Sequence, residues 1–134
     1  MNIKVRSLGI SNYQDTWEAM KNFVSSNPKN DEIWITEHYP IYTVGLNKKG
    51  INLPINKNIE TINVDRGGKI TYHGPGQLII YTMINTKKNC ITIRQLVTIL
   101  EQSVIHLLNK LGVKSFAKKD APGVYINNLS LIHI

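Results

Sequence analysis

The chain has 134 residues, of which 42% are hydrophobic and 19% charged, and its formal net charge is +7. These values are typical of one folded domain and exclude an intrinsically disordered chain. No apolar run is long enough to span a membrane, and the N-terminus lacks the apolar segment of a signal peptide. The single cysteine, Cys90, cannot form an internal disulfide, so we expect a cytoplasmic protein.

The positive charge is spread along the chain rather than gathered in one segment. Lys48–Lys49, Lys87–Lys88 and Lys118–Lys119 are separate pairs, and only three of the sixteen basic residues are arginine. Scattered lysine favours a solvated surface, or attraction of an acidic protein partner, over a nucleic-acid surface. We therefore expect no nucleic-acid partner.

The first half of the chain predicts one helix followed by short strands. Apolar residues at helical spacing predict a helix from Ser11 to Ser25, ended by Asn27–Pro28. Its predicted buried stripe consists of Tyr13, Trp17, Met20, Phe23 and Val24. Alternating or β-branched runs predict strands at residues 32–37, 41–44, 61–64, 69–73 and 78–84. The last two of these flank a Gly-Pro-Gly turn, residues 74–76, and therefore predict a hairpin or bulged ribbon.

The second half predicts one longer helix and two strands. Thr92 and Gln95 form a capping-box pattern, apolar residues follow at helical spacing, and Gly112 suits the position after the helix. Residues 113–116 and 124–126 are strand-like. The whole pattern predicts an α+β fold with mixed short strands and two packed helices.

Residues 66–77, RGGKITYHGPGQ, set a short strand between two glycine turns. Glycine loses much entropy on folding, so these turns indicate a need for positive φ or close backbone approach. Neither the dinucleotide nor the P-loop pattern is present, which argues against a nucleotide site of those types. Backbone N–H groups here can still meet an extended ligand. Arg66 can bind a carboxylate or phosphate, or instead lock the turn by pairing with Asp65 or another acid.

His38 and His73 each stand beside a turn and an aromatic residue. Either is a candidate general base or orienting donor near neutral pH, and the alternative is a partly buried histidine bonded to a backbone carbonyl. The four histidines and the cysteine lack the spacing of a metal site. Cys90 has no histidine beside it in sequence, so we expect a passive residue rather than a nucleophile.

Residues 66–84, RGGKITYHGPGQLIIYTMI, resemble the signature of lipoyl(octanoyl) transferases, which are related to biotin and lipoate protein ligases. Residues 7–20, 32–45 and 120–126 resemble further segments in the family's order. The resemblance implies a biotin/lipoate ligase-like α+β catalytic domain. It also implies transfer of an octanoyl group from acyl carrier protein to a lysine on lipoyl domains of 2-oxoacid dehydrogenases or on the glycine cleavage H protein. No metal or nucleotide cofactor is implied, because the substrate arrives as an activated thioester.

The resemblance also implies which residues bind the acyl group. They are Arg66, Gly67, Gly68, Lys69, Ile70, Thr71, Tyr72 and His73, with His38 and Tyr81 at further positions of the pocket. The family's catalytic lysine follows the segment matched by residues 120–126, and its cysteine lies later in an N-P-C-G context. Here Ser130 stands about where the lysine is expected, no N-P-C-G occurs, and Cys90 does not match the cysteine's position.

We therefore expect residues 1–128 to form part of a catalytic domain that carries no catalytic residue of its own and is inactive alone. Residues 129–134, LSLIHI, resemble a translated sequencing adapter and are expected to be a non-native tail. Two alternatives stay open. One is a non-catalytic module that binds acyl groups or acyl carrier protein. The other is an ATP-dependent lipoate-protein ligase.

Overall fold

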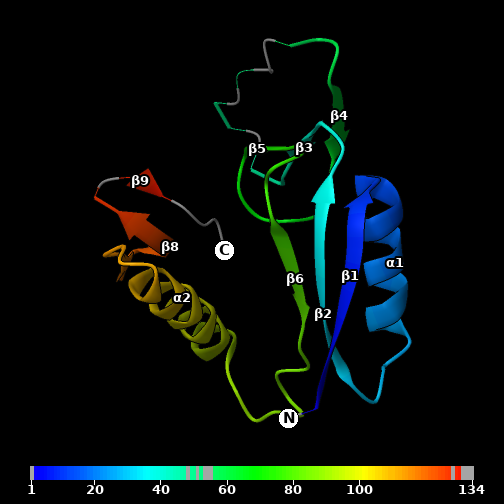
Figure 1. The fold of residues 1–134 in the computed structure, drawn as a ribbon. Coiled ribbons are helices and arrows are strands. Elements are labelled where there is room, and N and C mark those ends of the chain that lie inside the picture. Colours follow the sequence, from blue (N-terminus) through cyan, green and yellow to red (C-terminus); the bar gives the residue numbers. More distant parts are fainter. Residues whose placement is uncertain (1, 48, 51, 53–55, 128, 131–134) are drawn as a thin grey trace. The chain divides into compact units, whose positions relative to one another are not determined.

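The computed structural model describes residues 2–47, 49–50, 52, 56–127 and 129–130. The chain divides into two compact units, Met1–Ile84 and Asn85–Ile134. The first unit contains six strands and one helix, and the second contains three strands and one helix, among the described residues (Figure 1). The α+β class predicted from the sequence is confirmed.

The first sheet of unit 1, called sheet A, has the strand order β1-β2-β6. Its strands are β1 (Ile3–Ser11), β2 (Asp31–His38) and β6 (Ile79–Met83), with β1 parallel and β6 antiparallel to β2. Helix α1 (Tyr13–Ser25) connects β1 to β2, as a parallel pair requires, and lies beside β1 in Figure 1. Its start is capped by Asn12, whose side chain accepts a hydrogen bond from the backbone N–H of Asp15.

The second sheet of unit 1, called sheet B, has the order β4-β3-β5. Its strands are β3 (Ile41–Val44), β4 (Glu60–Asn63) and β5 (Ile70–His73). The first turns of α1 pack on this sheet, where Tyr13, Ile41 and Val64 form a buried cluster joined by Trp17 and Ile62. The last turns pack on sheet A, where the ring of Phe23 lies 6.0 Å from that of Trp34. One helix thus covers residues of both sheets.

The predicted hairpin at residues 74–76 is wrong, because β5 and β6 pair with different partners. β5 is antiparallel to β3, and β6 is antiparallel to β2. Only Tyr39 and Pro40 separate β2 in sheet A from β3 in sheet B, and β6 and β5 pair with these two strands in turn. Between β5 and β6, Gly76 lies in the left-handed region at φ 86°, and its N–H donates to Glu37 Oε2 at 2.7 Å. The glycine turn therefore carries the chain between sheets.

The other elements that the residue patterns predicted in unit 1 lie close to their predicted positions, whereas β1 was not predicted from these patterns. β3 has the predicted bounds, and α1, β2, β4, β5 and β6 differ from prediction by no more than two residues at either end. Val24 differs, since it is 58% exposed although predicted on the buried stripe. It lies in the last turn of α1 and follows Phe23, whose ring packs on sheet A, so its side chain leaves the helix in a different direction.

Unit 2 begins with helix α2 (Ile93–Lys110), which has the predicted capping box of Thr92 and Gln95. Gly112 follows its end at φ 76°, also as predicted. The N–H of Val113 donates to Leu108 O at 2.9 Å, which closes the helix end and keeps Val113 out of a strand. The strand predicted at 113–116 therefore shares only Phe116 with the observed one.

The sheet of unit 2 has the antiparallel order β7-β8-β9, formed by β7 (Phe116–Lys118), β8 (Ala121–Ile126) and β9 (Leu129–Ser130). Glu101 of α2 is buried and accepts a 2.7 Å hydrogen bond from the N–H of Gly123 in β8. Of the segment predicted as a tail, residues 129–130 form β9, and residues 131–134 lie outside the described residues.

Candidate functional site

Two histidines and two tyrosines lie together near the end of β2, where the chain passes from sheet A to sheet B. His38 is the last residue of β2, His73 is the last residue of β5, and Tyr81 lies in β6. The ring of His38 lies 5.8 Å from Tyr81, 6.0 Å from His73 and 5.1 Å from Tyr13, the first residue of α1. Three residues predicted from the sequence as site residues are therefore brought together.

The hydrogen bonds of His38 use both ring nitrogens. The backbone carbonyl of Ser11 can only accept, so Nδ1 donates to it at 3.0 Å and carries the proton. Burial lowers the pKa of His38, which favours the neutral ring and leaves Nε2 unprotonated. The Tyr81 hydroxyl therefore donates to Nε2 at 2.8 Å, and burial in turn raises the pKa of Tyr81. His38 has no exposed surface.

Three hydroxyl groups, from Ser11, Thr16 and Thr36, continue the hydrogen bonds of His38. The Ser11 hydroxyl lies 2.8 Å from the hydroxyls of both Thr16 and Thr36. Thr16 donates to Asn12 O at 2.7 Å, and Thr36 lies within hydrogen-bond distance of Gly9 O at 2.9 Å. Thr16 and Thr36 are both buried, so these bonds compensate for their desolvation. The group Ser11, Thr16, Thr36, His38 and Tyr81 is called the neutral network below.

His73 is placed by different contacts. Its ring stacks on that of Tyr13 at 5.7 Å with an interplanar angle of 11°. Its Nδ1 lies 2.6 Å from the side-chain oxygen of Gln77, whose side-chain nitrogen donates to Tyr72 O at 3.3 Å. Burial lowers the pKa of His73, and the nearby Arg66 charge lowers it further, against the raising effect of the Gln77 bond. Unlike His38, the His73 side chain is only half-buried.

Arg66 holds the first glycine turn in place. Its Nη2 donates to Thr43 O and to Thr43 Oγ1, both at 2.8 Å, and its Nη1 donates to Gly67 O at 2.8 Å. Asp65 accepts instead from Trp17 Nε1 at 3.3 Å. Within the described part of the chain Arg66 forms no ion pair, so the turn is locked through Thr43 rather than through an acid.

The turn that Arg66 holds packs closely on Gly45, the residue that follows β3. Gly45 N–H donates to Lys69 O at 2.6 Å. A methyl group at Gly45 would stand 2.5, 2.8 and 2.9 Å from the backbone oxygens of Gly68, Gly67 and Arg66. Gly68 itself has a φ of 82°. Gly45 is therefore the glycine that allows close backbone approach, and Gly68 is the one that adopts a positive φ.

The remaining predicted site residues lie along β5 and alternate between its two faces. Thr71 pairs with Thr43 and His73 pairs with Ile41, so both point toward the face covered by α1. Tyr72 points to the other face, where its ring lies 5.4 Å from Tyr42 and it remains 43% exposed. Ile70 is half-buried and Lys69 is exposed. Only the His73 end of the segment 66–73 reaches His38 and Tyr81.

Sequence reasoning missed the supporting residues of this site. Tyr13 was assigned to the core and stacks on His73, while Ser11, Thr16 and Thr36 received no role. Gln77 had one available signal, because it closes the quoted motif four residues after His73. The hydroxyl residues had none, because the contact that joins them to β2 links Ser11 to Thr36, 25 residues away in sequence.

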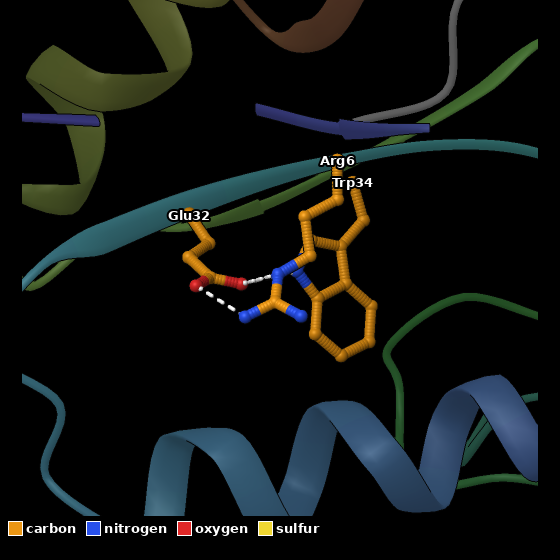
Figure 2. Close-up of polar contacts among 3 residues, drawn as sticks. All are labelled: Arg6, Glu32 and Trp34. Carbon is orange, nitrogen blue, oxygen red and sulfur yellow. Dashed lines mark hydrogen bonds and ion pairs between the residues drawn. The ribbon is translucent and has the colours of Figure 1, made fainter. Parts of the chain in front are cut away.

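An ion pair lies at the other end of the same face of sheet A. Figure 2 shows Arg6 of β1 with Glu32 and Trp34 of β2. Glu32 is buried, and it accepts from Arg6 at 2.9 and 2.6 Å and from Trp34 Nε1 at 2.7 Å. Hydrogen bonding to Arg6 lowers the pKa of Glu32. Arg6, which also lies over the Trp34 ring, remains 55% exposed.

Among the described residues, no three His, Cys, Asp or Glu side chains are close enough to hold a metal ion. No helix in the described ranges is long and apolar enough to cross a membrane. Cys90 is exposed, has a φ of 52°, and precedes α2 in unit 2.

Comparison with known families adds to this geometry. Residues 12–129 match the family described as the lipoyl protein ligase A/B catalytic domain. The chain belongs to this family. The resemblance predicted from the sequence is therefore confirmed, and the matched region includes His38, His73 and Tyr81.

Curated relatives match the chain over nearly its full length. The octanoyltransferase of Aeromonas hydrophila is 45% identical over 126 residues, which are 92% of this chain and 54% of that protein. The octanoyltransferase of Buchnera aphidicola is 47% identical over 127 residues, covering 93% of this chain and 60% of that protein. The chain thus spans between half and two-thirds of the length of these relatives.

Solved structures confirm the predicted lipoate protein ligase-like fold. A bipartite lipoate protein ligase from Thermoplasma acidophilum has a TM-score of 0.70 at 16% identity, covering 95% of this chain and 52% of that one. P. falciparum LipL1 in complex with lipoate has a TM-score of 0.68 at 12% identity, covering 96% and 42%. At such low identity the likeness concerns the fold alone.

Proposed function

We propose that this chain is the acyl-binding part of an octanoyltransferase. The observation that carries the proposal is the 45% and 47% identity to two octanoyltransferases over 92% and 93% of the chain. The proposed reaction moves an octanoyl group from the thioester of an acyl carrier protein to a lysine amine. The lysine belongs to a lipoyl domain of a 2-oxoacid dehydrogenase complex or to the glycine cleavage H protein.

The charge of the chain suits the proposed donor. Acyl carrier proteins are acidic, and a positive field steers an acidic partner toward the enzyme. Unit 2 carries seven lysines and arginines against two acidic residues, so it holds most of the net charge of +7. We expect the reaction to take place in the cytoplasm and to need no metal or nucleotide, since the thioester is already activated.

The proposed acyl site lies at the His73 end of β5. Tyr81 is proposed to form its wall, and the fully buried His38 is proposed to act behind it, by holding the Tyr81 hydroxyl through its hydrogen bond. Arg66 acts through the loop rather than on the ligand, since most of its N–H groups are bound to Thr43 and Gly67. The segment Gly67–Tyr72 is proposed to contact the octanoyl chain along β5.

The covalent chemistry of the proposed reaction needs a cysteine nucleophile and a lysine. Resemblance to the family places both after residue 126, and residues 1–134 contain no counterpart of either. We propose that a full-length protein containing this chain supplies them. The 134-residue chain alone is then expected to bind the acyl group without transferring it.

Incubation with octanoyl-acyl carrier protein and a purified lipoyl domain tests the proposal. Intact-mass spectrometry of the lipoyl domain reports octanoylation, and a lipoyl domain with its lysine changed to arginine is the matched control. A full-length protein containing this chain is expected to modify the wild-type domain without ATP. The 134-residue chain is expected to leave it unmodified.

Two other outcomes would replace the proposal. Modification of the domain by free octanoate with ATP, accompanied by pyrophosphate release, would indicate a lipoate-protein ligase. Binding of acyl carrier protein by the full-length protein, without an acyl-enzyme or a modified domain, would indicate a non-catalytic binding module.

A further inference from the structure

A glutamate lies in the middle of the covered face of helix α2. Glu101 is only 7% exposed, and it shares this face with Val97, Val104, Ile105 and Leu108, which lie at helical spacing and are half-buried. A carboxylate taken out of water needs an ion pair or compensating hydrogen bonds. Within the described residues Glu101 forms no ion pair, so hydrogen bonding carries this compensation.

The hydrogen-bond partner of Glu101 lies in a bulge of β8. Two residues of this strand, Pro122 and Gly123, have no opposite residue in β7, because the register of the two strands shifts there. Pro122 has no N–H to donate. Gly123 is buried, and its N–H donates to Glu101 Oε1 at 2.7 Å. The helix therefore supplies the acceptor that the neighbouring strand β7 does not.

The backbone at this bulge has a conformation that few residues adopt. Gly123 has a φ of 145°, in a region that side chains disfavour. The Tyr125 hydroxyl donates to Ala121 O at 3.0 Å and so bridges the bulge from one side to the other. Val124, between them, has no exposed surface. The bulge is thus held from α2 by Glu101 and from within β8 by Tyr125.

The course of β8 after the bulge determines where residue 130 lies. Tyr125 pairs with Ser130, and the next residue of β8, Ile126, pairs with Leu129. A bulge bends its strand and changes the direction of the side chains that follow it. A change at Gly123 therefore moves position 130, which stands about where resemblance to the family places the lysine.

We propose that Glu101 is a positioning residue for the lysine of octanoyl transfer. This inference rests on the proposed function, which places that lysine after residue 126 of a full-length protein. Glu101 acts through the backbone of Gly123 rather than on the substrate. Its oxygen holds the bulge, and the bulge sets the place of the lysine on β9.

Two substitutions separate the place of the Glu101 oxygen from its charge. Glu101→Gln keeps an oxygen at the same reach and removes the charge, whereas Glu101→Asp keeps the charge and withdraws the oxygen by one methylene. In a full-length protein containing this chain, Glu101→Asp should lower kcat for octanoylation of a lipoyl domain by about 100-fold, a usual effect of misplacing a reacting group. Glu101→Gln should stay close to wild type. KM for octanoyl-acyl carrier protein should change little in both variants.

Hydrogen exchange of the same full-length protein reports the contact without any catalysis. Mass spectrometry of the peptide that contains Gly123 follows its amide. That amide should exchange about tenfold faster in Glu101→Asp than in wild type, the effect of losing one hydrogen bond to a charged group, and nearly as slowly as wild type in Glu101→Gln. Gln102→Asp, at the exposed neighbouring position of α2, is the matched control and should change neither exchange nor kcat.

The order of the variants decides the role of Glu101. Faster transfer by Glu101→Asp than by Glu101→Gln would overturn the inference, because the carboxyl group itself would then matter. A wild-type kcat for Glu101→Asp, or faster exchange in every peptide of that variant, would assign Glu101 to the fold alone and also overturn it. If the wild-type full-length protein leaves the lipoyl domain unmodified, the proposed function fails and this inference fails with it.

Discussion

One face of sheet A carries two buried polar groups, one at each end of β2, and they meet the cost of burial in opposite ways. At the Glu32 end a buried carboxylate keeps its charge because Arg6 supplies two hydrogen bonds and a positive charge. At the His38 end the neutral network contains no charge at all. Both arrangements satisfy their polar atoms, which burial demands.

The difference between the ion pair and the neutral network indicates a different role for each end of β2. The ion pair joins β1 to β2 and touches none of the predicted site residues, so its role is in the fold. The neutral network ends beside His73, with the two histidine rings 6.0 Å apart, and so lies next to the proposed acyl site.

Removing His38 is the strongest way to break the neutral network. His38→Leu should destabilise the chain by about 3 kcal/mol, because it removes the hydrogen bonds of both ring nitrogens and leaves the Tyr81 hydroxyl without its acceptor. Urea unfolding monitored by circular dichroism measures the change. His106→Leu, at an exposed position on α2, is the control and should stay within about 0.5 kcal/mol. A cost for His38→Leu as small as that of the control would contradict a structural role for the network.

Removing only the donor to His38 should have a smaller effect. Tyr81→Phe leaves His38 Nε2 buried without a partner, with an expected cost of about 2 kcal/mol. The same unfolding experiment measures it, and Tyr39→Phe at a 58% exposed position serves as the control. If the two phenylalanine variants were equally stable, the Tyr81 hydroxyl would not be bonded to His38 in solution.

Much of the fold could be predicted because its signals are local. The capping box of Thr92 and Gln95 and the glycine after α2 specify that helix within a few residues of each end. The turn at residues 74–76 is different, since a glycine turn between two strands has the same sequence whether the strands pair with each other or with two others. Here the pairing with β2 and β3 decides, and those strands lie more than 30 residues earlier.

The candidate site shows the same limit at the level of single atoms. Sequence motifs identified His38 and His73 but gave them the same two alternatives. The partner of Nδ1 is the backbone oxygen of Ser11 in His38 and the side-chain oxygen of Gln77 in His73, and only the folded chain defines these contacts. For Arg66 the sequence left an acid partner open, whereas the structure bonds it to Thr43, 23 residues away in sequence.

The two ends of β2 should lose stability in separate pH ranges. Burial lowers the pKa values of His38 and His73 from 6.5, so the unfolded chain binds more protons than the folded chain just below that pH. Their contribution to stability is complete above about pH 6.5 and falls as the pH drops toward the folded values. The pKa of Glu32 is also lowered, but by the hydrogen bond and charge of Arg6 rather than by burial. It is lowered from 4.5, so the contribution of Glu32 to stability is lost only below that pH. Urea midpoints from pH 8 to 3 should therefore fall in two stages.

Substituting Arg6 should weaken the acid stage and spare the other, and it should lower stability most at neutral pH, where the buried Glu32 carboxylate is ionised and loses its partner. Arg6→Met keeps an apolar stem over Trp34 and takes away the hydrogen bonds and charge that lower the pKa of Glu32. Burial, which raises that pKa, is then opposed only by the Trp34 hydrogen bond and the Lys4 charge, so acid below pH 4.5 should destabilise the folded chain through Glu32 less than in the wild type. The stage near pH 6.5 should persist, because no atom of Arg6 contacts the neutral network. Loss of both stages in this variant would show that the two ends of β2 are coupled, and the division of the strand into a structural end and a site end would fail.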